Sequence, residues 1–192
     1  MRLKKHTKYT ILYSAIRKLL TVIYTILKVG LVSSGKMIPF CGGSVITSRH
    51  ILTAAHCTFD EYTNDVVDPS SIQVLLEEHN TTDSVVDRRD VSTIINHPRF
   101  NENADYDYAV ITITTPITFS PTVAPICLPA SVDTLYTYQM AKVLGWGHTS
   151  FNGEPSPTLQ EVDVMVMSNE QCSDQYPGRI KRLQPEFEFI NN

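Results

Sequence analysis

The chain has 192 residues, of which 42% are hydrophobic and 19% are charged, a balance that supplies a packed core and excludes wholesale disorder. Its net charge of −4 conceals two compositions. Residues 1–36 carry eight of the 16 Lys and Arg and none of the 20 Asp and Glu, whereas residues 37–192 have a net charge of −12. Because nucleic-acid binding needs clustered Lys and Arg to neutralise phosphates, the acidic body argues against a nucleic-acid partner.

The first 26 residues form a basic and apolar segment that has three interpretations. A basic start over residues 2–8 followed by apolar residues is typical of a secretory targeting segment. The apolar runs 9–16 and 19–27 are both shorter than the roughly 18 residues of a membrane-spanning helix. Apolar residues at helical spacing are also compatible with a basic amphipathic helix on a membrane surface, a weak signal: Leu12, Ile16, Leu19, Ile23 and Ile26. The third interpretation is sequence that does not belong to the folded domain.

From Cys41 onward, short β-rich runs alternate with turn residues. We expect strands at 43–47, 72–76, 91–95, 109–114, 141–144 and 162–167. The run from Val162 to Val166 alternates in a way that predicts a half-buried antiparallel strand. Short strands at near-regular spacing predict an all-β sandwich or barrel. One short helix is expected around Ser168–Gln175, with Ser168 as its N-cap and Gln171 three residues later.

Three motifs carry the most specific information in the chain. They are Cys41-Gly-Gly-Ser-Val-Ile with Leu52-Thr-Ala-Ala-His56-Cys57, then Asp107-Tyr-Ala-Val, then Leu144-Gly-Trp-Gly147. In this order and spacing they resemble the trypsin/chymotrypsin family of serine endopeptidases (peptidase family S1) over about residues 27–178. Lesser echoes are Glu78-His-Asn80, His97-Pro98 and Ile126-Cys-Leu-Pro129.

The resemblance implies an all-β fold, a trypsin-like double antiparallel β-barrel whose second barrel is incomplete. We expect a truncated trypsin-like domain over residues 27–178, with the first barrel at about 27–118 and a partial second barrel at about 119–178. Residues 1–26 would then be the basic N-terminal segment and residues 179–192 a divergent tail.

The resemblance also implies catalytic roles for two residues. His56 matches the general base, and Asp107 matches the carboxylate that orients it and fixes its tautomer. Asp105 is a rival carboxylate, but Asp107 lies two residues before Ala109, as in the family pattern. The alternatives are a structural histidine and an ordinary aspartate at the start of a strand. The remaining histidines lack a comparable context: His6, His50, His79, His97 and His148.

The four cysteines match the family unevenly. Cys41 and Cys57 match a disulfide that closes the histidine loop, which would pin the loop carrying His56. Cys127 and Cys172 match positions whose usual partner cysteines do not occur in these 192 residues. Disulfides are typical of oxidising compartments, so we expect an extracellular, secreted protein.

The family's nucleophile is not found among these 192 residues. It lies in a Gly-Asp-Ser-Gly-Gly-Pro segment, and the last glycine here is Gly178. Ser168 and Ser173 have no flanking glycines and are not credible substitutes. Without this segment the oxyanion hole and the specificity pocket are also missing, so we expect the chain as written to be inactive.

Two hypotheses follow. In the first, the chain is part of a trypsin-like serine endopeptidase, whose partners, once completed, are polypeptide substrates and protease inhibitors. In the second, it is a non-catalytic homologue that acts as a binding or decoy protein. We expect no cofactor and no metal. Glu78 and Asn80 match the start of a calcium loop, but Arg88 falls where this loop would need an acidic ligand.

Overall fold

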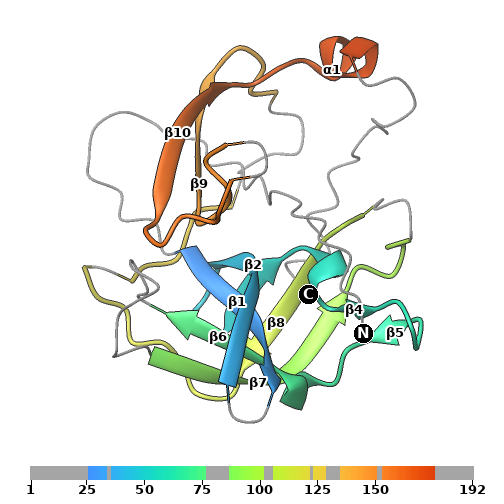
Figure 1. Cartoon of the computed structure of the whole chain (residues 1–192), viewed down its shortest axis with the longest axis vertical. Helices are drawn as coiled ribbons and strands as arrows, with labels where there is room; N and C mark the ends of the chain where they lie inside the picture. The colour runs from blue at the N-terminus through green and yellow to red at the C-terminus, as the bar shows by residue number, and fades with distance from the viewer. Residues whose placement is uncertain are drawn as a thin grey trace.

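The computed structural model describes residues 26–33, 36–76, 87–101, 106–121, 123–128, 135–150 and 153–175. Ten strands dominate these ranges (Figure 1). They are β1 (Ile26–Ser33), β2 (Lys36–Val45), β3 (His50–Thr53), β4 (Phe59–Asp60), β5 (Asp65–Val66), β6 (Ile72–Leu76), β7 (Asp87–Asn96), β8 (Ala109–Ile113), β9 (Met140–Gly145) and β10 (Gln160–Met165). The helical elements are the short 3₁₀ turns η1 (Ala55–Cys57) and η2 (Pro69–Ser71) and the helix α1 (Asn169–Gln175). The all-β prediction is therefore confirmed.

Six strands close into an antiparallel barrel in the order β1-β2-β3-β8-β7-β6, with β1 paired to both β2 and β6. The barrel occupies the lower part of Figure 1, while β9, β10 and α1 lie above it. The second barrel consists, within the described residues, of the two-stranded sheet β9–β10. The fold is thus one closed barrel followed by an incomplete second one. The residue limits predicted for the two barrels and for the tails stay predictions.

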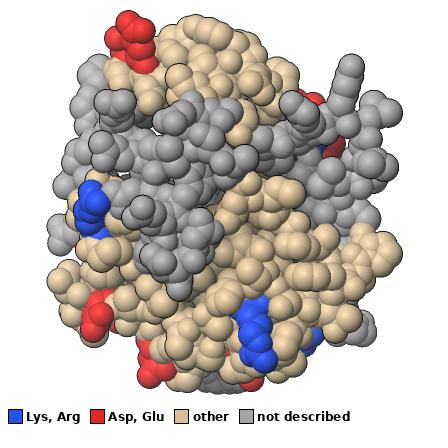
Figure 2. All heavy atoms as spheres, turned by 180° about the vertical axis from the view of Figure 1, so that it is seen from behind, with Lys and Arg blue, Asp and Glu red and all other residues tan. Residues whose placement is uncertain are grey.

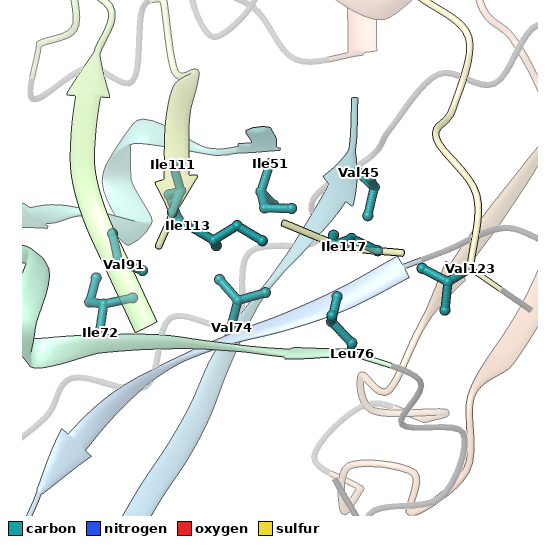
Figure 3. Packing of buried hydrophobic residues seen from close by; sticks show 10 residues of the cluster. All are labelled: Val45, Ile51, Ile72, Val74, Leu76, Val91, Ile111, Ile113, Ile117 and Val123. Atoms are coloured by element: carbon teal, nitrogen blue, oxygen red, sulfur yellow. The ribbon is translucent and has the colours of Figure 1, made fainter. Parts of the chain in front are cut away.

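Alternation along the strands fills the barrel with aliphatic side chains, as expected of a barrel this small. On β8 the side chains of Ala109, Ile111 and Ile113 are fully buried, and those between them are partly exposed. Figure 3 shows ten buried side chains, eight of them on strands and two, Ile117 and Val123, on the segment after β8: Val45, Ile51, Ile72, Val74, Leu76, Val91, Ile111, Ile113, Ile117 and Val123. This packed interior gives the strand ends a rigid base.

Most of the predicted elements coincide with observed ones. The strand predicted at 72–76 matches β6 at both ends, and five others fall on β2, β7, β8, β9 and β10 with shifted ends. The predicted helix is α1, and its capping box is formed: the Gln171 N–H donates to Ser168 Oγ (3.1 Å), and the Ser168 N–H donates to Gln171 Oε1 (3.2 Å).

Two predictions about burial and helicity are wrong. β10 is antiparallel to β9, but all six of its residues are exposed, Val162 by 56%, because an alternating pattern marks a face that can be buried and does not by itself supply a covering element. Ile26, placed in the possible amphipathic helix, lies in β1, where backbone pairing with Ser44 of β2 fixes an extended conformation. The rest of that helix and the remainder of the basic N-terminal segment, residues 1–25, lie outside the described residues.

Charged side chains support the β9–β10 pair from its surface. Lys142 Nζ lies 3.0 Å from Glu161 Oε1 and 3.1 Å from Asp163 Oδ1 on the facing strand, and hydrogen bonds from these two carboxylates raise the pKa of Lys142. On the face of the molecule in Figure 2, the basic side chains of the described residues are scattered and form no continuous patch.

Candidate active site

Strand pairing brings His56 and Asp107 together although they are 51 positions apart in sequence. β3 runs antiparallel to β8, and Thr53 at the end of β3 pairs with Ala109 at the start of β8. Residue 56 lies three positions after Thr53 and residue 107 two positions before Ala109, so both leave the barrel at the same edge. The 3₁₀ turn η1 then folds His56 back towards Asp107.

The Asp107 carboxylate binds His56 with both oxygens. Oδ1 accepts the backbone N–H of His56 at 2.8 Å, and Oδ2 lies 2.7 Å from Nδ1 of the imidazole. Because an ionised carboxylate can only accept, Nδ1 must carry the proton and Nε2 must hold the free lone pair. The side chains are 29% and 23% exposed, so the pair is shielded but accessible. The arrangement prepares Nε2 to accept a proton.

Two further connections hold the turn that carries His56. The predicted Cys41–Cys57 disulfide is present and ties η1 to β2. On the other side, the fully buried Thr58 donates through its hydroxyl to Asn96 Oδ1 on β7 at 2.5 Å. Neither Thr58 nor Asn96 belongs to a motif found in the sequence, and only the folded barrel shows their part in fixing this turn.

The other candidate residues of the sequence have different surroundings. The Ser168 hydroxyl caps α1, and Ser173 lies within that helix, which supports rejecting both as nucleophiles. The rival Asp105 lies outside the described residues. Among the cysteines that the structure describes, Cys127 and Cys172 form no disulfide, the first being exposed and the second partly buried.

The other described histidines contact hydroxyl, carbonyl and aromatic groups. His50 Nδ1 lies 2.8 Å from Thr47 Oγ1, and His148 contacts the carbonyl oxygen of Gly153. His97 is buried in the barrel edge near Asp107, at 3% exposure. Sequence inspection marked His97-Pro98 only as a lesser match to the family, although this histidine packs against the residues that flank Asp107.

Within the described part of the chain, one group of side chains has the proximity of a metal site: Cys41, His56 and Cys57, whose donor atoms lie within 4.8 Å of one another. The two sulfur atoms are bonded to each other in the disulfide, so they are not thiolate ligands. His56 Nε2, 3.5 Å from Cys57 Sγ, is the single free donor of the three. These residues do not fit a metal in the oxidised protein. The calcium-loop residues Glu78 and Asn80 lie outside the described residues.

None of the helices in the described ranges has the length and apolar character that crossing a membrane requires.

Comparisons with known proteins agree with this geometry. The family model for Trypsin matches residues 27–188. The chain is 35% identical over 146 residues to a venom serine protease of Polistes dominula, covering 73% of this chain and 51% of that protein. It is 37% identical over 147 residues to cationic trypsin-3 of Rattus norvegicus (73% and 54%) and 33% identical over 143 residues to the proclotting enzyme of Tachypleus tridentatus (71% and 38%).

The chain therefore spans about half or less of the length of these curated relatives. The family match nevertheless extends over most of the chain and includes both His56 and Asp107. With the closed antiparallel barrel and the histidine loop disulfide, it leads to one conclusion: the chain belongs to the trypsin family of serine proteases.

Proposed function

We propose that this chain supplies the histidine and aspartate of a serine-type endopeptidase. The observation that supports this most strongly is the pair of hydrogen bonds from His56 to the Asp107 carboxylate, 2.8 Å from the backbone N–H and 2.7 Å from Nδ1. A merely structural histidine needs no such carboxylate facing Nδ1 with Nε2 left as an acceptor. A serine hydroxyl from outside these 192 residues would complete the triad.

In this mechanism each residue has a separate task. His56 Nε2 takes the proton of the serine hydroxyl as the oxygen attacks the scissile carbonyl, and it then gives that proton to the departing amine. Asp107 stays ionised, holds the ring with Nδ1–H towards itself and stabilises the imidazolium that forms between the two steps. The Cys41–Cys57 disulfide limits movement of the loop during both proton transfers.

The chain as written lacks the nucleophile, so we expect it to be inactive alone. The completed protein would act on polypeptides and be blocked by protein inhibitors of serine proteases. An extracellular location is supported by the disulfide, which persists in oxidising compartments. It is also supported by similarity to a protein named as a venom protease. A membrane role of the basic N-terminal segment remains the weaker proposal, and liposome flotation of residues 1–36 tests it.

The second candidate function is that of a non-catalytic homologue that binds partners or acts as a decoy. The missing Gly-Asp-Ser-Gly-Gly segment favours it. The formed His56–Asp107 pair favours the endopeptidase, because a binding protein gains nothing from a polarised imidazole. The two proposals differ in whether longer transcripts restore the serine segment.

Peptide hydrolysis by the natural protein separates the two functions. Antibodies to residues 36–76, a part of the barrel, would capture the protein from its source for incubation with a library of unstructured peptides. The endopeptidase proposal expects cleavage that a serine-reactive phosphonate abolishes. The purified chain 1–192, as the matched control, should cleave nothing. Captured protein that leaves the library intact would contradict the proposal.

A further inference from the structure

Tyr106, the residue directly before Asp107, has an unusual backbone conformation. Its φ is 52°, in the left-handed region that bulky side chains rarely adopt. Among the described non-glycine residues, Asn64 and Tyr138 also have a positive φ. Asparagine tolerates the left-handed region, whereas tyrosine does not. A strained tyrosine persists only when its surroundings hold it there, and such strain is concentrated at functional sites.

Two neighbouring residues hold the Tyr106 ring. It stacks on the imidazole of His97, with centroids 4.8 Å apart and planes 9° from parallel. Arg99 holds the same ring: its Nη1 donates to Tyr106 Oη at 3.0 Å, and its guanidinium carbon lies 4.9 Å from the ring centroid. Stacking and cation–π contacts together can offset an unfavourable backbone conformation.

His97 is a fixed support for the Tyr106 ring, because it is 97% buried and forms hydrogen bonds through both its backbone and its ring. Its backbone N–H donates to the Tyr108 carbonyl oxygen at 2.9 Å, and its Nδ1 accepts the backbone N–H of Arg99 at 3.1 Å. The Tyr108 ring meets the imidazole edge-on at 5.3 Å. His97 thus contacts the residues on both sides of Asp107.

We propose that Tyr106, held by His97 and Arg99, is a positioning residue for Asp107. The Tyr108 N–H donates to the Tyr106 carbonyl oxygen at 2.8 Å, which makes a tight turn with Asp107 at its centre. Holding Tyr106 and Tyr108 from the turn that follows β7 fixes the direction of the Asp107 side chain, and with it the two hydrogen bonds to His56. Loss of the contacts of the Tyr106 ring would leave the backbone at residue 106 free to change conformation and so to swing the Asp107 carboxylate away. The inference rests on the proposed function in taking Asp107 as the orienting carboxylate.

The test uses the Nδ1 proton of His56 in the chain 1–192, observed by NMR far downfield of the amides. Its rate of exchange with water reports the Asp107 hydrogen bond and requires no nucleophile, so the outcome is independent of whether the protein cleaves peptides. In Tyr106→Asn the backbone conformation is tolerated but the ring contacts are lost. We expect exchange about ten-fold faster, equivalent to about 1.4 kcal/mol.

Tyr138→Asn is the matched control, since Tyr138 also has a positive φ (63°) but is 62% exposed and follows the barrel. It should leave the His56 proton unchanged. Equal exchange rates in the Tyr106→Asn and Tyr138→Asn variants would overturn the proposal, because a general loss of stability would act on both. If Tyr106→Asn does not fold, Arg99→Met is the second test, because it removes the cation–π contact with the Tyr106 ring. Exchange of the His56 proton about three-fold faster supports the proposal, and an unchanged exchange rate overturns it.

Discussion

Replacing Asp107 by Asn should reverse the tautomer of His56. In the native pair, Asp107 accepts two hydrogen bonds, from the His56 backbone N–H at 2.8 Å and from Nδ1–H at 2.7 Å. An asparagine side chain offers one acceptor and one donor. Its oxygen can keep the backbone N–H of His56, but its NH₂ group then faces Nδ1. Nδ1 must become the acceptor, so the ring proton moves to Nε2 and the base needed for catalysis is lost.

The structure sets the size of this effect. A hydrogen bond to a charged group contributes about 1.5–3 kcal/mol, and the 29% and 23% exposure of the two side chains favours the lower half of that range. About 1.5–2 kcal/mol corresponds to a roughly 10- to 30-fold preference for the Nδ1–H tautomer in the native chain. The neutral bond from Asn contributes about 1 kcal/mol in the opposite sense, a roughly five-fold preference for Nε2–H.

Long-range nitrogen–proton correlation spectra of ¹⁵N-labelled imidazole distinguish the two tautomers directly. The spectra would be recorded at about pH 9, where an ordinary histidine is neutral. Asp68→Asn is the matched control, because Asp68 is an exposed turn carboxylate that accepts from Ser70 and does not approach His56. It should leave the native tautomer in place. An Nε2–H tautomer in the native chain, or the same tautomer in native and Asp107→Asn proteins, would refute the reasoning.

Three further predictions concern the framework of the site. Ile111→Ala should lower the free energy of unfolding by about 2–5 kcal/mol in urea titrations, because the side chain is fully buried in the barrel, whereas Ile95→Ala at a 56% exposed position should change it by less than about 0.5 kcal/mol. The double variant Cys41→Ser/Cys57→Ser opens a loop closed over 16 residues and should lower the free energy of unfolding by about 3 kcal/mol in the same urea titrations. A urea midpoint equal to that of the native chain would contradict a stabilising role of the disulfide. Ser168→Ala should remove the cap of α1 at a cost of about 1 kcal/mol, seen as faster amide exchange in residues 170–172, and unchanged protection there would show that the cap contributes nothing.

Much of the fold could be predicted because local signals and global structure agree. Alternation and turn residues located β6 and β8 closely, and the Ser168–Gln171 spacing predicted the capping box that the structure contains. The His56–Asp107 pairing could be predicted only through the family resemblance. No local pattern says that residues 51 positions apart meet; the antiparallel register Thr53↔Ala109 is what brings them together.

Other features escaped prediction because they arise from tertiary contacts. The contacts of His97 and Arg99 with Tyr106 join the turn after β7 to the turn before β8, and the match of His97-Pro98 to the family says nothing of these contacts. The burial of β10 was predicted from its alternating pattern, but alternation records which face can be buried and not whether an element covers it.

The central claim, that His56 and Asp107 serve a serine nucleophile, is tested most directly by covalent labelling of the protein from its natural source. A fluorophosphonate would be applied to this protein, followed by intact mass measurement and peptide mapping. The account predicts a species heavier than 21.6 kDa that contains the His56 and Asp107 peptides and one label, on a serine outside residues 1–192. A species of 21.6 kDa or less that contains both peptides and takes up no label would contradict it.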